Sequence, residues 1–208
     1  MVESAWAGGA TPIVVVAPDP TGGVAAALAG SPAILAEPAP EAGGPVAQIA
    51  RGIRVAAGAV TETDGALIWP GRMVWVDAET VTSLIEAHGA YGESVLRPAY
   101  DGTDGWPALV PIDLLGELEA QAADLMPDAL LDALAGGADL HRLDTGDPGV
   151  TYDLATAIDD LPPYQGPPEP VAGYAPEWGA AAADSPDEGP LEGPALAPYP
   201  QAGDPDAD

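Results

Sequence analysis

The residue that raises the sharpest chemical question is Arg72, which follows an apolar run in the stretch LIWPGRMVWVDAETVTSLIEAH, residues 67–88. The run predicts a buried strand, and many α/β enzymes place a metal-binding carboxylate in the loop after such a strand. An arginine keeps its proton in a protein and cannot ligate a metal ion. The chain has 33 acidic residues and only 5 basic ones, so a cation at this position needs an explanation.

Two roles for Arg72 are open. Its guanidinium could mimic a missing metal ion by offering a fixed positive charge to a phosphate or to an acidic partner loop. Alternatively, it forms a local ion pair, with Asp77, Asp101 or Asp104 as the expected partner. We favour the ion pair. Because an exposed pair contributes only ~0–1 kcal/mol, we expect the loss of Arg72 to leave the stability of the fold nearly unchanged.

Other residue types that often do chemistry lack the necessary neighbours. His88 ends an expected helix, where a capping role is favoured. His141 has no second histidine spaced for a metal. No serine lies in the G-x-S-x-G pattern of a hydrolase nucleophile. The sequence therefore predicts no catalytic residue, no metal site and no cofactor.

Composition excludes several classes of function. The formal net charge of −28 argues against nucleic acid and anionic membranes as partners, because both need a basic surface. No apolar run approaches the ~20 residues of a membrane span, and the N-terminus lacks the pattern of a signal peptide. A cytoplasmic location is therefore the default expectation. The acidity fits either a GC-rich genome or a surface adapted to salt.

Residues 1–161 alternate continuous apolar runs with helical patterns, which is typical of a parallel sheet covered on both faces. We therefore predict a doubly wound, mostly parallel α/β domain with its functional loops at the carboxyl ends of the strands. The helix after Asp77 has the clearest start, because an aspartate is a preferred cap. The run PIDLLGELEAQAADL predicts a further helix. The runs expected as strands are TPIVVVAP, AILAEP, GALIW, SVLRPAY, DLHRL and GVTYDL.

Residues 162–208 differ sharply in composition from the rest of the chain. They hold 12 of the 25 prolines, 9 acidic residues and no basic residue. Such a segment cannot bury enough apolar surface to offset the entropy cost of ordering it. We therefore predict an extended or disordered acidic tail. Aromatic residues spaced along this tail are candidate anchors for a partner: Tyr164, Tyr174, Trp178 and Tyr199.

Several segments resemble the MobA-like family of molybdenum-cofactor nucleotidyltransferases, which join CTP or GTP to molybdopterin. GRMVWVDAETV is similar to that family's G-D-M-P-L-V-D-P-E-T-L, and LRPAYDGTDGWPALV to its R-P-x-Y-x-G-x-x-G-H-P-V-L. TPIVVVAPDP, GGPVAQIARGI and DPGVTYDL resemble further segments, in the family's order, over most of residues 11–161. The resemblance implies a nucleotidyltransferase, Rossmann-like fold that uses Mg²⁺ and CTP or GTP.

The departures from the family pattern concern the residues that the resemblance makes functional. The glycine-rich phosphate loop and its lysine are missing, so the chain looks N-terminally truncated. Arg72 stands where the family has a Mg²⁺-binding aspartate, and Trp106 where it has a histidine. Asp153 keeps the first acid of the closing motif, but Ala155 replaces the second. Together these departures predict that phosphoryl transfer has been lost.

Three functions remain open. We favour a non-catalytic relative that acts as a subunit, scaffold or maturation partner in a larger assembly, which the resemblance implies is related to molybdoenzymes. The first alternative is an active cytidylyl- or guanylyltransferase, with Mg²⁺, whose phosphate loop comes from another chain or from upstream sequence. The second is a sensor that binds a nucleotide or another small molecule without magnesium.

The favoured function requires a protein partner or self-association. Tryptophan dominates the energetics of many interfaces, so the domain's candidates for a partner-binding surface are Trp69, Trp75 and Trp106. A first strand lost from a doubly wound sheet would also expose a central sheet edge, and such edges invite pairing. We therefore expect a partner strand or a dimer.

Overall fold

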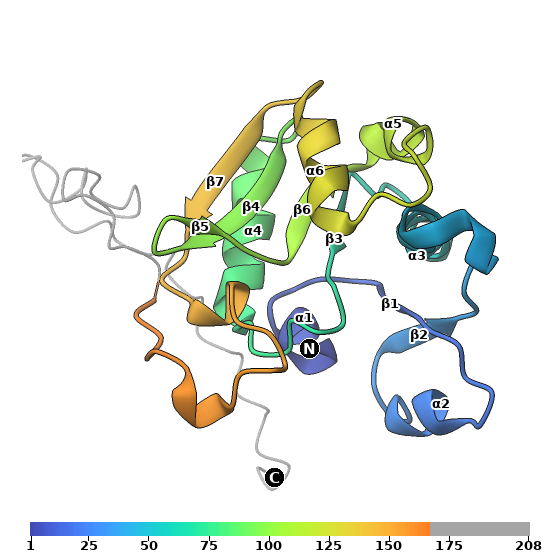
Figure 1. Ribbon diagram of the computed structural model, residues 1–208, viewed down its shortest axis with the longest axis horizontal. Coiled ribbons are helices and arrows are strands. Elements are labelled where there is room, and N and C mark those ends of the chain that lie inside the picture. The colour runs from blue at the N-terminus through green and yellow to red at the C-terminus, as the bar shows by residue number, and fades with distance from the viewer. Residues whose placement is uncertain (167–208) are drawn as a thin grey trace, which may run out of the picture. The chain divides into compact units, whose positions relative to one another are not determined.

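The computed structural model describes residues 1–166 (Figure 1). Most of the expected tail therefore lies outside the described residues, together with its candidate anchors Tyr174, Trp178 and Tyr199. The first residues of that segment contact the domain, because Gln165 N–H donates to the Gly146 carbonyl at 3.1 Å.

The N-terminal third of the chain builds a small parallel sheet. Strand β1 (Ile13–Val16) pairs with β2 (Ala33–Ala36), and Ile13 lies opposite Ala33. Both strands lie in runs expected to be strands, TPIVVVAP and AILAEP. The surrounding helices are α1 (Val2–Ala7), α2 (Gly23–Ala27), the 3-10 helix η1 (Glu41–Gly43) and α3 (Gly44–Ala59).

The main sheet has five strands in the order β3-β6-β4-β5, with β7 also paired to β4. Their bounds are β3 (Gly65–Ile68), β4 (Val95–Tyr100), β5 (Thr103–Asp104), β6 (Ala108–Pro111) and β7 (Leu140–Asp144). Among the described strands of this sheet, β4 and β7 pair in parallel, whereas β3–β6, β4–β6 and β4–β5 are antiparallel. The prediction of a mostly parallel sheet is wrong for this sheet, and the fold is a mixed α/β arrangement.

The physical reason for this difference is a tight turn after β4. Asp101 and Gly102 have φ angles of +49° and +73°, a left-handed conformation that lets the chain reverse over two residues. The chain then returns along β4 as β5 and β6. The sequence ALVP, which forms β6, is not among the runs expected to be strands.

The C-terminal helices also differ from expectation. The helix expected over PIDLLGELEAQAADL is reduced to the 3-10 helix η2 (Ile112–Leu114) and α5 (Leu115–Glu119), and a separate α6 (Pro127–Ala135) follows. The run GVTYDL is not a strand, because Pro148–Val150 forms the 3-10 helix η3. A last 3-10 helix, η4, spans Ile158–Asp160.

Helix α4 (Ala78–Ala90) begins where the sequence predicts, because the Asp77 carboxylate accepts the Glu79 N–H at 2.9 Å. Such a cap satisfies one of the unpaired N–H groups of the first turn. The stretch GGPVAQIARGIRVAAG forms most of the long helix α3. Within the described part of the chain, no helix is long and apolar enough to cross a membrane.

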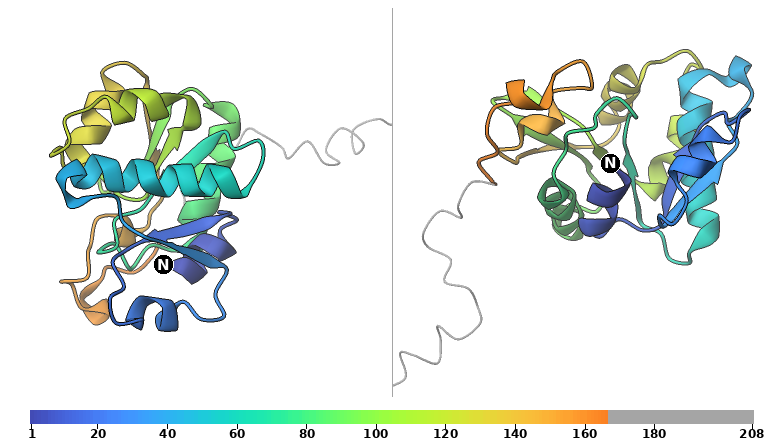
Figure 2. Two further views of the ribbon diagram at one scale, coloured as in Figure 1. Left: turned by 90° about the vertical axis from the view of Figure 1, so that its right-hand side faces the viewer. Right: turned by 90° about the horizontal axis from the view of Figure 1, so that it is seen from below.

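Successive residues of β4 point to opposite faces of the main sheet, as in any strand. Val95 belongs to the larger core, which also contains buried residues of α3, α5 and α6. Leu96 packs instead with Leu84 of α4 and with Leu109. Helices α3 and α6 therefore cover one face and α4 the other (Figures 1 and 2).

Candidate functional site

The loop after β3 presents Arg72 at its tip. The Met73 N–H donates to the Pro70 carbonyl at 3.0 Å, which closes the turn. The Trp69 indole N–H donates to the Met73 carbonyl at 2.8 Å and fixes the turn against the strand end. The Arg72 side chain is 55% exposed. Two hydrogen bonds therefore fix this short turn, which presents the exposed Arg72 guanidinium after the carboxyl end of β3.

A second segment, far along the sequence, docks onto this loop. The Leu154 N–H donates to the Arg72 carbonyl at 2.8 Å. The Trp75 indole N–H lies 3.1 Å from the carbonyl oxygens of both Asp153 and Thr156. Residues 153–156 form the closing segment, and the loop that carries Arg72 therefore positions their backbone.

This docking brings Arg72 and Asp153 together. Arg72 Nε lies 3.9 Å from Asp153 Oδ2, at the outer limit of an ion pair. Arg72 is thus paired, as expected, but with Asp153 rather than with the three aspartates considered from the sequence. Of those three, Asp77 caps α4 and Asp104 makes a two-bond pair with Arg142 at 2.6 and 3.0 Å.

The Asp153 carboxylate lies beside a positive charge. Its Oδ1 accepts the Ala155 N–H at 2.9 Å, while Oδ2 faces the guanidinium. A neighbouring positive charge repels a cation. Among the residues that the structure describes, no group of three or more His, Cys, Asp or Glu side chains is arranged to hold a metal ion.

Trp106 lies in the core. It takes part in none of the contacts of Arg72 and Asp153 described above. It is only 3% exposed, and its N–H donates to the Val150 carbonyl at 2.9 Å. Trp69 and Trp75 are half-buried, and both use their indole N–H groups within the domain. Trp106 is therefore not available to an exposed partner-binding surface of the three tryptophans.

Arg97 is a buried charge that sequence reasoning did not single out. It is 5% exposed, lies 5.2 Å over the Trp106 ring, and donates to the Gly105 carbonyl at 3.2 Å. Its Nη2 also reaches Asp128 Oδ1 at 3.0 Å in the first turn of α6. The available signal was a charged residue inside the apolar run SVLRPAY, since buried charges are almost always paired.

Asp147 is a second buried charge that the sequence did not flag. It is 2% exposed, and its Oδ2 accepts both the Asp77 N–H at 2.9 Å and the Thr80 hydroxyl at 2.8 Å. Its Oδ1 accepts the Gly149 N–H at 2.8 Å. Asp147 therefore joins the start of α4 to η3 and supports the loop on which the Arg72–Asp153 pair depends.

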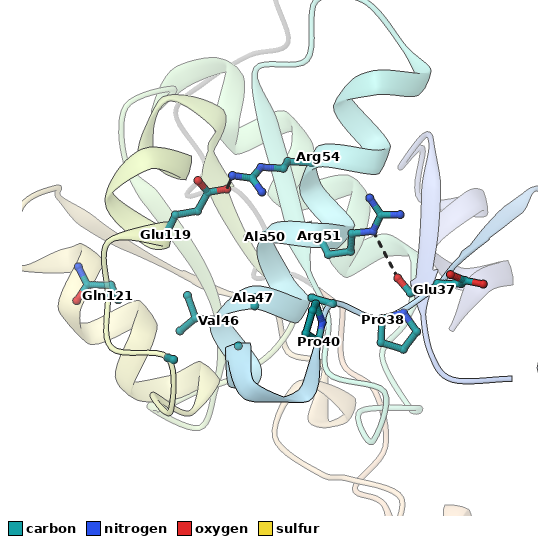
Figure 3. Close-up of a pocket in the computed structure, with 13 residues that line it drawn as sticks. Glu37, Pro38, Pro40, Val46, Ala47, Ala50, Arg51, Arg54, Glu119 and Gln121 are labelled. Carbon is teal, nitrogen blue, oxygen red and sulfur yellow. Dashed lines mark hydrogen bonds and ion pairs between the residues drawn. The ribbon is translucent and has the colours of Figure 1, made fainter. Parts of the chain in front are cut away.

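A hollow on one side of α3 holds two of the five arginines (Figure 3). Its volume is about 680 Å³, and its lining includes Arg51, Arg54, Glu37 and Glu119. Arg54 pairs with Glu119 at 2.6 Å, whereas Arg51 Nε donates to the Glu37 carbonyl at 3.4 Å. Among the described residues, the other N–H donors of the Arg51 guanidinium have no hydrogen-bond acceptor.

Comparisons with solved structures show the same fold elsewhere. A Mycobacterium tuberculosis protein, described as a complex with manganese, is 20% identical with a TM-score of 0.52, over 69% of this chain and 73% of that one. A nucleotidyl transferase from Methanothermobacter is also 20% identical, with a TM-score of 0.56, over 71% of this chain and 68% of that one. No match to a curated protein was found.

Sequence comparison gives the family. The MobA-like NTP transferase domain matches residues 2–138, which cover both sheets up to α6 and include the Arg72 loop. This match agrees with the resemblance inferred from the segments around Arg72 and Trp106. The chain therefore belongs to the family of MobA-like NTP transferase domains.

Proposed function

We propose that this protein is a non-catalytic member of its family, which acts as a subunit, scaffold or maturation partner in a larger assembly. The observation that carries the proposal is the pairing of Arg72 with Asp153 at the carboxyl end of β3. The family resemblance suggests that the assembly is related to molybdoenzymes.

Nucleotidyl transfer needs a way to neutralise the negative charge of the phosphates. Charge develops on the phosphoryl oxygens, and these enzymes neutralise it with a divalent ion held by carboxylates. Here the loop after β3 offers a guanidinium instead, and the nearest carboxylate already accepts a backbone N–H. A divalent ion placed between the two side chains would meet one repulsive partner and a single carboxylate. The site supports binding to a negative group better than metal-assisted transfer.

The test of this proposal is turnover. The purified chain is incubated with CTP or GTP, molybdopterin and either Mg²⁺ or Mn²⁺, and pyrophosphate release is followed. Mn²⁺ is included because the similar Mycobacterium tuberculosis protein is described as a manganese complex. We expect no release above a reaction without protein. Release that depends on the metal would overturn the proposal and favour the transferase alternative.

A sensor for anionic small molecules is the second candidate function, and the hollow beside α3 favours it. Arg51 is exposed, and within residues 1–166 it makes one side-chain hydrogen bond, to a carbonyl oxygen. The two acidic residues in the lining offset much of its attraction, which is why this function ranks second. It predicts nucleotide binding without magnesium that is weakened by Arg51→Ala but not by Arg142→Ala, whose guanidinium lies elsewhere and pairs with Asp104.

A further inference from the structure

Arg51, in the middle of α3, differs from the other four arginines of the chain. Each of those four forms an ion pair with a carboxylate, at N–O distances between 2.6 and 3.9 Å: Arg54, Arg72, Arg97 and Arg142. Arg51 forms no ion pair within residues 1–166, although the chain has 33 acidic residues. Its side chain is exposed in the wall of the hollow beside α3, where a ligand can reach it.

The segment that follows β2 orients the guanidinium of Arg51. Its Nε–H donates to the Glu37 carbonyl at 3.4 Å, as Figure 3 shows. A guanidinium presents its N–H donors in a planar fork, and two parallel donors of that fork match the two oxygens of a carboxylate. Because the Nε–H is the donor that contacts the protein, the two Nη groups form the pair that can bind a carboxylate end-on.

The wall of the hollow opposite Arg51 is fixed by the protein itself. The Ala39 N–H donates to Gln48 Oε1, and Gln48 Nε2 donates back to the Ala39 carbonyl, both at 2.9 Å. Pro38 and Pro40 flank Ala39, and the ring of a proline fixes its φ angle. A wall that is already in place reduces the entropy cost of binding a ligand.

The surface next to Arg51 consists of small apolar side chains. Ala47 lies one turn before Arg51 on the same face of α3, and Ala50, Pro38 and Pro40 also line the hollow. Alanine and proline side chains offer neither a charge nor a hydrogen bond, so they suit an apolar group. The hollow has a volume of about 680 Å³, within the range of roughly 300–1,000 Å³ that is usual for small-molecule sites.

The electrostatics of the hollow favour a ligand with a single negative charge. Arg54, the other cation of the lining, is already paired with Glu119 at 2.6 Å. Glu37 also lines the hollow, and the whole chain has a net charge of −28. Like charges repel. A triphosphate would therefore bring several negative charges to one unpaired guanidinium, whereas a carboxylate brings one.

We propose that the hollow beside α3 binds a small monocarboxylate with an apolar body, whose carboxylate is held by the two Nη groups of Arg51. The proposal rests on the second candidate function, the sensor for anionic small molecules, and names the class of its ligand. In the described part of the chain, none of the residues that line the hollow belongs to the Arg72 loop or to the closing segment. The site is therefore separate from the Arg72–Asp153 pair.

The test follows the Arg51 side chain by nuclear magnetic resonance of the full chain. Five arginines give at most five Nε–H signals, and the signal that disappears in Arg51→Gln belongs to Arg51. Cyclohexanecarboxylate and benzoate are the probes. Three comparison ligands are acetate, which lacks the apolar body, cyclohexanecarboxamide, which lacks the charge, and CTP without magnesium.

We expect both probes to shift the Arg51 signal and the backbone amides of α3, and to bind more tightly than any of the three comparison ligands. Arg51→Gln, checked for folding by circular dichroism, should weaken binding of the probes about tenfold or more, because it removes charge-assisted hydrogen bonds. Arg142→Gln is the control, since it changes an exposed arginine outside the hollow, and it should leave the affinity unchanged.

Equal binding of the carboxamide, an unshifted Arg51 signal, an unchanged affinity in Arg51→Gln, or no binding by either probe would overturn the proposal. Tighter binding of CTP through Arg51 would overturn the ligand class and support the sensor function. If no anion binds through Arg51, both the ligand class and the sensor function are wrong. Metal-dependent turnover, by contrast, would overturn the non-catalytic function and leave carboxylate binding intact.

Discussion

Arg72 Nε lies 3.9 Å from Asp153 Oδ2, and the backbones that carry the two residues are joined by the bond from Leu154 N–H to the Arg72 carbonyl. The backbone hydrogen bond therefore holds the two segments together without the ion pair. The ion pair changes the charge at the loop after β3 more than it stabilises the position of that loop.

The first prediction is that Arg72→Ala hardly changes stability. The side chains of the pair are 55% and 41% exposed, and exposed pairs contribute about 0–1 kcal/mol. We expect a change in the free energy of unfolding below about 1 kcal/mol in urea denaturation. Arg142→Ala is the control, because it removes a closer ion pair whose side chains are 58% and 24% exposed. A loss for Arg72→Ala far above that of the control would show that the pair supports the fold.

The second prediction concerns metal binding. Arg72→Asp would exchange the repulsive guanidinium for a carboxylate near Asp153, and carboxylate oxygens suit Mg²⁺ and Mn²⁺. We expect the variant to bind Mn²⁺ measurably more tightly than the natural chain, as measured by electron paramagnetic resonance of free Mn²⁺. Arg142→Asp adds the same charge elsewhere and should produce no comparable gain. If both variants gain equally, the effect is one of net charge and not of the site.

The third prediction is that Asp147→Ala strongly destabilises the protein. The change would leave the Asp77 N–H, the Thr80 hydroxyl and the Gly149 N–H without their acceptor. An unsatisfied buried donor costs about 1–3 kcal/mol, so we expect a loss of roughly 3 kcal/mol or more in urea unfolding. Asp160→Ala, at an exposed carboxyl group, is the control and should change little. Similar values for the two variants would contradict the role of Asp147.

The fourth prediction is a pH dependence at Tyr164. Partial burial raises the pKa of the phenol of Tyr164, a residue that is 38% exposed, above its ordinary value of 10.0, and the hydrogen bond to Glu79 Oε2 at 2.7 Å raises it further. A raised pKa in the folded state stabilises the protein fully below pH 10 and progressively less as the pH rises from there. We expect natural protein to lose stability between about pH 9 and 11 and Tyr164→Phe to lose less. Absorbance of tyrosinate shows the ionisation directly, and ionisation of Tyr164 near pH 10 would contradict the prediction.

Local features of the fold could be predicted from sequence where the cause is local. The start of α4 was predictable because the Asp77 cap acts on a residue two positions away. The direction of the strands was not, because an apolar run has the same pattern in a parallel and in an antiparallel pair. The run ALVP, which follows the reversal at Asp101 and Gly102, is not among the expected strands.

The same difference between local and long-range causes applies to the candidate site. The sequence predicts that Arg72 forms an ion pair, since the chain offers many carboxylates. It does not predict Asp153 as the partner, because that contact depends on the Trp75 indole holding the closing segment. The buried roles of Arg97 and Asp147 depend on elements that are distant in sequence, and no short motif indicates them.

The measurement that tests the central claim most directly is a calorimetric titration of the full chain with CTP and with GTP, each with and without Mg²⁺. If the guanidinium of Arg72 has replaced the metal chemistry of the family, no titration should show heat that depends on magnesium. Binding that appears only with magnesium would contradict this account, because it would require a working metal site beside the Arg72–Asp153 pair.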